Sequence, residues 1–143
     1  MKAAPLIIIL FCVLGIMPRE CLAELYIIVN SANTIESVTA DQVSRIFLQK
    51  TKRFENGLTT EPIAQAEGTK PRQVFNEKIL QRNEQQLKYY WSRKMFSGGD
   101  RPPATAADDA AVLTRIAEKP GAIGYVGKKP TSTKIKIVLT IGD

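Results

Sequence analysis

The sequence predicts a three-layer α/β/α sandwich, and three observations lead to this fold class. A near-continuous apolar run, LYIIVN at residues 25–30, is typical of a strand that is buried on both faces. Apolar residues with helical spacing follow this run, starting after Thr39 in the sequence. Two further strand-like segments, at residues 122–126 and 134–141, lie near the end of the chain. Strands that alternate with helices indicate an α/β domain with helices on both faces of its sheet.

The first helix is expected to begin behind Thr39 and to end near Lys50. Residues 39–42 fit a capping box, in which the Thr and Gln side chains bond to each other's backbone N–H groups. The apolar residues behind this box fall on one helical face: Val43, Ile46 and Phe47. An Asn-Gly pair at 56–57 then predicts a turn, and residues 61–65 predict a short strand.

Three more helices are expected after this strand. One begins at Pro71, because proline has the φ angle that a first helical position requires. The next begins at Asn83, and we expect it to bury one face: Leu87, Tyr90, Trp91 and Met95. Residues 97–105, SGGDRPPAT, are too rich in Gly and Pro for regular structure and predict a loop. Residues 106–119 predict an alanine-rich helix. Its inward residues are expected to be Val112, Leu113 and Ile116.

The first 23 residues are expected to be a secretory signal peptide. Lys2 is a positive n-region, residues 3–17 are an uncharged apolar h-region, and residues 18–23 end in Cys-Leu-Ala before a cleavage site behind Ala23. An uncleaved N-terminal anchor is the alternative. No later stretch of the sequence approaches the roughly 20 apolar residues that span a bilayer. We therefore expect a periplasmic or secreted domain, residues 24–143, with no integral membrane span after cleavage.

The composition excludes several classes of chemistry. Both cysteines, Cys12 and Cys21, lie in the predicted signal peptide, and the sequence contains no histidine. A domain of residues 24–143 therefore has no disulfide, no thiol nucleophile and no imidazole base or metal ligand. No residue pair resembles a nucleophile with its base, so we expect a protein that is not an enzyme and uses no cofactor. Asp108 and Asp109 suggest a pair of metal ligands. The simpler interpretation is that both carboxylates lie at the start of a helix, where the helix dipole favours negative charge.

The predicted domain carries a moderate positive charge. Without Lys2, Arg19 and Glu20, 18 basic and 13 acidic residues remain, which gives a net charge of +5. This excess favours anionic partners, but the basic residues are scattered, as they are on an ordinary solvated surface. Predicted secretion and the lack of a basic–aromatic stripe in the sequence argue against nucleic acid as a partner.

Four stretches of the sequence share their order with one known family. They are VTADQVSRIFLQKTKRFENG at 38–57, EGTKPRQVF at 67–75, YYWSRKMFSGG at 89–99 and KPGAIGYV at 119–126. In these stretches the chain resembles the phosphate-binding periplasmic proteins of ABC transporters, which have the type 2 periplasmic binding-protein fold. The resemblance covers nearly all of the predicted domain but only one of the two lobes of a full binding protein. It implies a lobe that supplies about half of the contacts to phosphate or another oxyanion, in ABC-type phosphate uptake or sensing.

The stretch EGTKPRQVF places Gly68 and Thr69 where a strand is followed by a helix. The first N–H groups of a helix lack partners and its dipole favours negative charge, so these residues predict an anion site. Lys70 and Arg72 lie in the first turn and are expected to reach the same anion, although Pro71 removes one N–H donor. The alternative is that Thr69 serves only as the N-cap of the helix.

The resembled family also holds phosphate with side chains that this sequence lacks. Counted back from Thr69, Glu67 stands in the place of the family's serine, Gln65 in that of its aspartate and Ile63 in that of its arginine. A carboxylate close to phosphate weakens binding unless a cation offsets it. In the alternative without an anion, Glu67 contacts a neighbouring cation at the surface.

Two more distant residues are candidates for the same site. Arg101 is expected to restore the missing guanidinium, because Gly98 and Gly99 let its loop fold back; alternatively it is exposed or paired with Asp100. Ser31 follows the first predicted strand, and ligand sites of α/β proteins gather at the carboxyl ends of strands.

A second class of function competes with oxyanion binding. A lobe without its partner lobe exposes the surface that faced that partner, and such a surface can dock another protein. The sequence therefore also supports a non-catalytic adaptor or interaction module of the envelope that has lost ligand binding.

Overall fold

The structure of the protein is a computed structural model that describes residues 24–142. The predicted signal peptide, residues 1–23, lies outside the described residues, and its cleavage therefore remains a prediction. Within residues 24–142 no helix is both long and apolar enough to cross a membrane.

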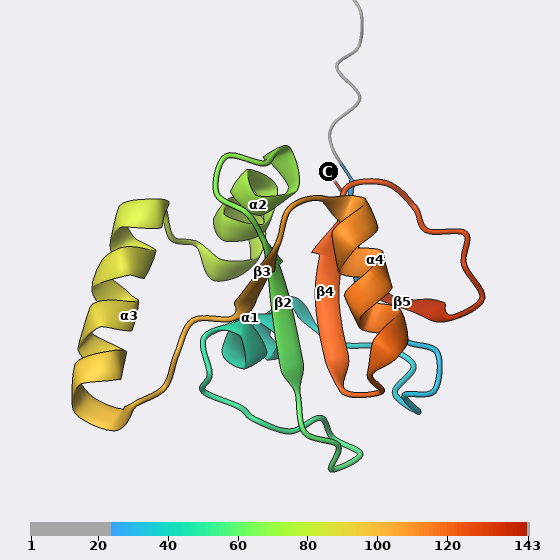
Figure 1. Ribbon diagram of the computed structural model, residues 1–143, viewed down its shortest axis with the longest axis horizontal. Helices are drawn as coiled ribbons and strands as arrows, with labels where there is room; N and C mark the ends of the chain where they lie inside the picture. The colour runs from blue at the N-terminus through green and yellow to red at the C-terminus, as the bar shows by residue number, and fades with distance from the viewer. Residues whose placement is uncertain (1–23, 143) are drawn as a thin grey trace, which may run out of the picture.

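A mixed five-stranded sheet forms the centre of the structure (Figure 1). Its strands are β1 (Leu25–Asn30), β2 (Glu61–Gln65), β3 (Ala104–Ala106), β4 (Ala122–Val126) and β5 (Ile135–Ile141). In space they follow the order β3-β2-β4-β1-β5. Strand β2 is parallel to both of its neighbours, β3 and β4, whereas β1 is antiparallel to β4 and β5. The carboxyl ends of β2, β3 and β4 therefore lie on the same side of the sheet, along its strand ends. The carboxyl end of β1 lies on the opposite side.

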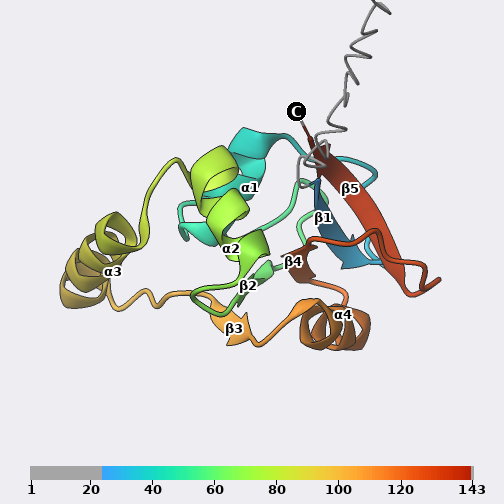
Figure 2. The same ribbon diagram turned by 90° about the horizontal axis from the view of Figure 1, so that it is seen from above.

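Helices cover both faces of this sheet, as the sequence predicts. They are α1 (Ala40–Phe47), α2 (Lys70–Phe75), the π-helical segment η1 (Asn76–Leu80), α3 (Glu84–Gly98) and α4 (Asp109–Glu118). Figure 2 shows α1 and α2 on one face of the sheet and α4 on the other. The three-layer α/β/α class is thus confirmed.

Strand β1 lies between two hydrophobic cores, and all six of its residues are therefore buried. Leu25, Ile27 and Val29 face the core under α1 and α2, whereas Tyr26 and Ile28 face the core under α4. This alternation explains why the strand reads as a continuous apolar run: each of its faces meets a helical layer.

The predicted starts of α1, α2 and α3 are confirmed to within one residue. Thr39 and Gln42 form the predicted capping box, with N···O distances of 3.1 Å and 2.8 Å for its two bonds. Asn83 and Gln86 form a second one before α3. Helix α1 ends at Phe47, slightly before the predicted end near residue 50.

The prediction of one loop over residues 97–105 is wrong at both ends. Helix α3 extends to Gly98, and Ala104 begins the short edge strand β3, which pairs with β2 at Ile63. The prolines that precede it favour extended backbone, which allows three residues to join the sheet edge. Helix α4 begins at Asp109, three residues later than predicted, because Asp108 is its N-cap.

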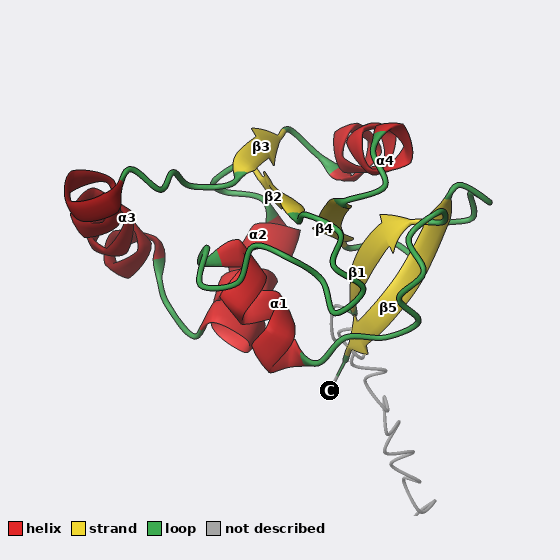
Figure 3. Ribbon diagram, turned by 90° about the horizontal axis from the view of Figure 1, so that it is seen from below, coloured by secondary structure: helices red, strands yellow, loops and turns green. Residues whose placement is uncertain are grey.

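Helix α3 projects beyond the edge of the sheet, and in Figures 1 and 3 it stands apart from the other helices. Leu87 and Trp91 are buried as predicted, but Met95 is 51% exposed, so its predicted inward position is wrong. Helical spacing places Met95 near the face of Trp91, yet the last turns of α3 have no layer of the domain above them.

Gly124 in β4 offers a test of the packing between the sheet and α4. A Cβ at this position would lie 2.8 Å from Val112 Cγ1 and 3.3 Å from the carbonyl oxygen of Ile63. We expect Gly124→Ala to lower the free energy of unfolding by about 1–3 kcal/mol, because the side chain overpacks the core. Urea unfolding followed by circular dichroism measures this loss.

Gly98→Ala is the matched control, since a Cβ there meets no atom within 4 Å. We expect this variant to raise the free energy of unfolding by less than about 1 kcal/mol, because Ala has a higher helix propensity than Gly. Equal losses for the two variants would contradict the described packing.

Candidate functional site

The predicted anion corner lies at the carboxyl edge of β2, where Figure 1 shows the start of α2 next to the start of α4. A β-turn joins β2 to α2, with Thr69 N donating to Ala66 O at 3.4 Å. Gly68 has φ of 89°, the sign that the third residue of a type II turn requires. Glu67, Gly68 and Lys70 are exposed. A solute can therefore reach this turn.

Thr69 is the N-cap of α2, which was the alternative to a ligand contact. Its Oγ1 accepts a hydrogen bond from Arg72 N at 3.3 Å and donates one to Ala66 O at 3.0 Å. The hydroxyl proton is therefore used within the turn. In the described chain the N–H groups of Gly68 and Lys70 donate to no protein group. With the N–H group of Glu67, which also has no protein acceptor among the described residues, they are the backbone donors that remain for an anion.

Arg72 is committed to an internal ion pair and not directed at the exposed turn. Its Nε and Nη2 donate to the two carboxylate oxygens of Glu84 at 2.6 Å and 2.9 Å, and its Nη1 donates to Gln65 O at 2.8 Å. Asn76 Nδ2 adds a bond of 2.7 Å to Glu84. This bidentate pair joins α2 to the first turn of α3.

The electrostatics of this pair follow from its hydrogen bonds. The bonds from Arg72 hold the pKa of Glu84 below its ordinary value, against the opposing effect of burial. The bonds to Glu84 likewise raise the pKa of Arg72. Both groups are therefore charged at neutral pH, and an anion that recruited Arg72 would have to leave Glu84 without its cation.

Asp109 occupies the neighbouring niche at the ends of β2 and β4. Its carboxylate accepts hydrogen bonds from Gln65 Nε2 at 2.6 Å, from Gly127 N at 3.1 Å and from Lys128 N at 3.1 Å. Backbone N–H groups at such a strand end are the donors that an oxyanion would use. The chain thus fills this niche with a carboxylate of its own.

Gln65 links this niche to the core. It is 1% exposed, its Nε2 also donates to Tyr125 O at 3.2 Å, and its backbone N donates to the Tyr125 hydroxyl at 3.0 Å. The Tyr125 ring stacks on Phe75 of α2 at a centroid distance of 4.0 Å, and burial raises the pKa of Tyr125 to about 12. These contacts fix the position of α2 over the ends of the two strands.

The other two predicted site residues lie elsewhere. Ser31 follows β1, which is antiparallel to β4, and its N–H donates to Lys134 O at the opposite edge of the sheet. The sequence argument for Ser31 required β1 to run parallel to β2. Arg101 is exposed on the segment that enters β3, at the end of that strand opposite to α2. The structure thus brings together Gly68, Thr69 and Lys70, and directs Arg72 inward.

Sequence reasoning missed the role of Asp109. It placed both aspartates at the start of a helix, and Asp108 does cap α4 by accepting from Ala111 N at 2.9 Å. Asp109 instead bonds to residues 18 and 44 positions away in the sequence. No local pattern signals such partners. In the described part of the chain, no cluster of acidic residues has the arrangement to hold a metal ion.

Comparison with solved structures shows which known proteins share the fold of the domain that carries this site. A Clostridium perfringens protein assigned as a phosphate ABC transporter substrate-binding protein, with bound phosphate, matches with TM-score 0.64 and 15% identity over 81% of this chain and 45% of its own. An ABC-type phosphate transport receptor from Vibrio cholerae matches with TM-score 0.63 and 15% identity, over 82% and 47% of the two chains. PstS from Borrelia burgdorferi matches with TM-score 0.56 and 11% identity, over 75% and 42%.

The described domain therefore has the fold of one lobe of these binding proteins. The chain spans less than half the length of each of the three. No family model and no curated protein sequence matches it. The resemblance seen in the sequence is thus supported at the level of the fold, and ligand binding is a separate question.

The ion pair of Arg72 and Glu84 generates a prediction about stability. Because the pKa of Glu84 is lower in the folded state, its contribution is present above the unfolded pKa of about 4.3 and is lost as pH falls through the folded value. We expect Glu84→Gln to lower the free energy of unfolding by about 1–2 kcal/mol at pH 7 and by less near pH 3. Urea unfolding at the two pH values measures both effects.

Asp41→Asn is the control for this variant. Its ion pair with Arg45 lies on the surface, with side-chain exposures of 74% and 59%, so we expect a change within about 0.5 kcal/mol. A loss for Glu84→Gln that does not depend on pH would contradict the assigned role of the charge.

The niche of Asp109 generates a second prediction. Asp109→Ala frees the N–H groups of Gly127 and Lys128, so phosphate should bind there and raise the melting temperature of this variant more than that of the unaltered protein. Differential scanning fluorimetry with about 0–20 mM phosphate at constant ionic strength measures the shift.

Asp108→Ala removes the adjacent carboxylate and a helix cap, at a cost of about 1 kcal/mol, but frees no donor in the niche. Phosphate is therefore expected to raise its melting temperature no more than that of the unaltered protein. If phosphate stabilises both variants equally, Asp109 does not occupy an anion niche.

Proposed function

We propose that the protein is an oxyanion-binding lobe of the phosphate class, with its ligand at the turn formed by residues 67–70. The observation that carries this proposal is an exposed turn in which the N–H groups of Gly68 and Lys70 have no protein partner. The amine of Lys70 adds a positive charge next to these donors. The fold match to phosphate-binding proteins supports the ligand class.

The binding is expected to be weak. Three positions at which the resembled family has phosphate ligands carry Ile63, Gln65 and Glu67, and the carboxylate of Glu67 opposes an anion. Arg72 already serves Glu84. With backbone donors and one cation, a dissociation constant on the order of 1 mM is a reasonable expectation.

The proposed biological setting is phosphate uptake or sensing outside the cytoplasm. The predicted signal peptide supports the compartment, and one neighbour is an ABC-type phosphate transport receptor. At this affinity the lobe would respond to high phosphate concentrations and would not scavenge traces of the ion.

An adaptor without a ligand is the second candidate, and one observation favours it. The groups best suited to bind phosphate in the described chain already have internal partners. Arg72 donates to Glu84, and the N–H groups of Gly127 and Lys128, which follow β4, donate to Asp109. A lobe with such internal bonds keeps its fold without any ligand.

Isothermal titration with phosphate separates the two candidates. We expect saturable binding near 1 mM at low salt, weakened at least about threefold by Lys70→Gln, because the variant removes the cation and keeps the turn. Lys70 is preferable to Thr69 as the test position, since Thr69→Ala would also remove the cap of α2.

Lys50→Gln is the matched control, because Lys50 is exposed and follows α1, away from the turn. It is expected to leave the affinity within about twofold. No heat up to about 10 mM phosphate, or equal effects of the two variants, would favour the adaptor over oxyanion binding.

A further inference from the structure

Helix α3 carries a surface that the oxyanion proposal does not use. Only Leu87 and Trp91 of its described side chains are buried, whereas Tyr89 is 66% exposed and Phe96 is 97% exposed. Large side chains at this exposure keep most of their contact with water on folding and contribute little to the core. Their presence on a helix that projects from the domain indicates contact with another molecule.

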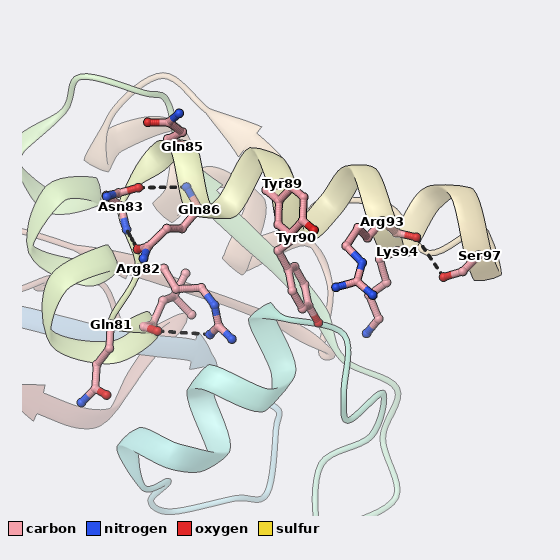
Figure 4. A pocket seen from close by; sticks show the side chains of 11 residues that line it. Gln81, Arg82, Asn83, Gln85, Gln86, Tyr89, Tyr90, Arg93, Lys94 and Ser97 are labelled. Atoms are coloured by element: carbon pink, nitrogen blue, oxygen red, sulfur yellow. Dashed lines mark hydrogen bonds between the residues drawn. The ribbon is translucent and has the colours of Figure 1, made fainter.

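A groove of about 900 Å³ runs along α3 toward the end of α1 (Figure 4). Its walls carry the aromatic residues Tyr89 and Tyr90 and the cations Arg82, Arg93 and Lys94. No aspartate or glutamate is among the described residues that line it. In Figure 4 Tyr90 and Lys94 extend from α3 toward the end of α1, and Arg82 borders the same space.

The two guanidinium groups of the groove contact aromatic rings and no carboxylate of the described chain, and Arg82 and Lys94 also donate to the carbonyl groups of Leu80 and Leu48. Arg82 lies 5.4 Å and Lys94 5.5 Å from the Tyr90 ring centroid, and Arg93 lies 5.7 Å from that of Tyr89. Within residues 24–142 neither Arg82 nor Arg93 forms a salt bridge, and Lys94 has only a distant one of 3.7 Å with Asp100. The two guanidinium groups are available to an anionic partner.

We propose that this groove docks an acidic segment of a partner protein. Charge complementarity identifies the partner's chemistry, because carboxylates of the segment would supply the anions that the groove lacks. Tyrosine and arginine are the side chains that most often carry the binding energy of protein interfaces. The three cations lie against two rings, Arg82 and Lys94 against Tyr90 and Arg93 against Tyr89, so several carboxylates of one chain segment can pair with them.

The residues of the surface favour a protein segment over a membrane. Phe96, the exposed apolar side chain of α3 that a bilayer would take up, is not among the residues that line the groove. Side-chain amides on the same wall, such as Gln81 and Gln85, can bond to the backbone of an entering segment. With Arg82, which precedes α3, the helix forms a basic and aromatic stripe that the sequence analysis did not find, because the turns of the helix separate its residues in the sequence.

Fluorescence anisotropy with a labelled random copolymer of glutamate and tyrosine tests the proposal. We expect saturable binding that weakens with salt, and no binding of labelled polylysine. Arg93→Glu should weaken binding at least about tenfold, because it places a carboxylate in the groove. Arg115→Glu, the same substitution at an exposed position on α4, should change it less than about twofold.

Four outcomes would overturn the proposal, three from binding assays and one from sedimentation of the protein alone. The first is no binding of the copolymer, and the second is equal weakening by the two variants, which would mean that only net charge matters. The third is binding of phosphatidylglycerol vesicles, sensitive to Arg93→Glu, without binding of the copolymer. Sedimentation of the protein alone identifies self-association, in which case the groove docks a second copy instead. The inference does not depend on oxyanion binding, since Arg93→Glu leaves residues 67–70 and their titration with phosphate unchanged.

Discussion

The hydrogen bonds at the carboxyl ends of β2 and β4 determine which backbone donors near these strand ends remain free for a ligand. Gln65, buried at the end of β2, bonds to Tyr125 through its backbone N–H and to both Tyr125 and Asp109 through its side chain. Because Tyr125 also stacks on Phe75, the same group of contacts places α2 over the sheet. The described N–H donors of this cluster, on Gln65, Gly127 and Lys128, all have a protein partner, so the strand ends are stable without a ligand.

Protein groups thus stand where a ligand would otherwise be expected. Asp109 supplies a negative charge to the N–H groups behind β4, and Glu84 supplies one to Arg72. Each anion is part of the chain, so its local concentration is fixed and high, and a free oxyanion must compete with it. The exposed turn at residues 67–70 escapes this competition because the N–H groups of Gly68 and Lys70 have no internal acceptor within residues 24–142. The physical argument for oxyanion binding therefore concerns this turn and not the niche beside it.

Local features of the fold were predictable from the sequence, and long-range ones were not. The cap at Thr39, the apolar run of β1 and the turn at Gly68 depend on neighbours within a few residues, so their patterns are readable. The antiparallel direction of β1, which separates Ser31 from the site, depends on strand pairing across about 100 residues of sequence. The bonds of Asp109 likewise join distant segments. Met95 has the spacing of a core residue, but its exposure depends on where the sheet ends.

The ion pair of Arg72 and Glu84 connects the two surfaces of the domain. Arg72 belongs to α2, whose start forms the exposed turn, and Glu84 belongs to the first turn of α3, which carries the groove. Helix α3 projects from the sheet edge, so few other contacts restrain its direction, and this bidentate pair restrains its beginning. Tyr90 and Lys94 restrain its middle through bonds of 2.5 Å and 2.9 Å to Leu48 O. A ligand that displaced Glu84 from Arg72 would therefore also loosen the helix that docks a partner, whereas an anion at Lys70 leaves it in place.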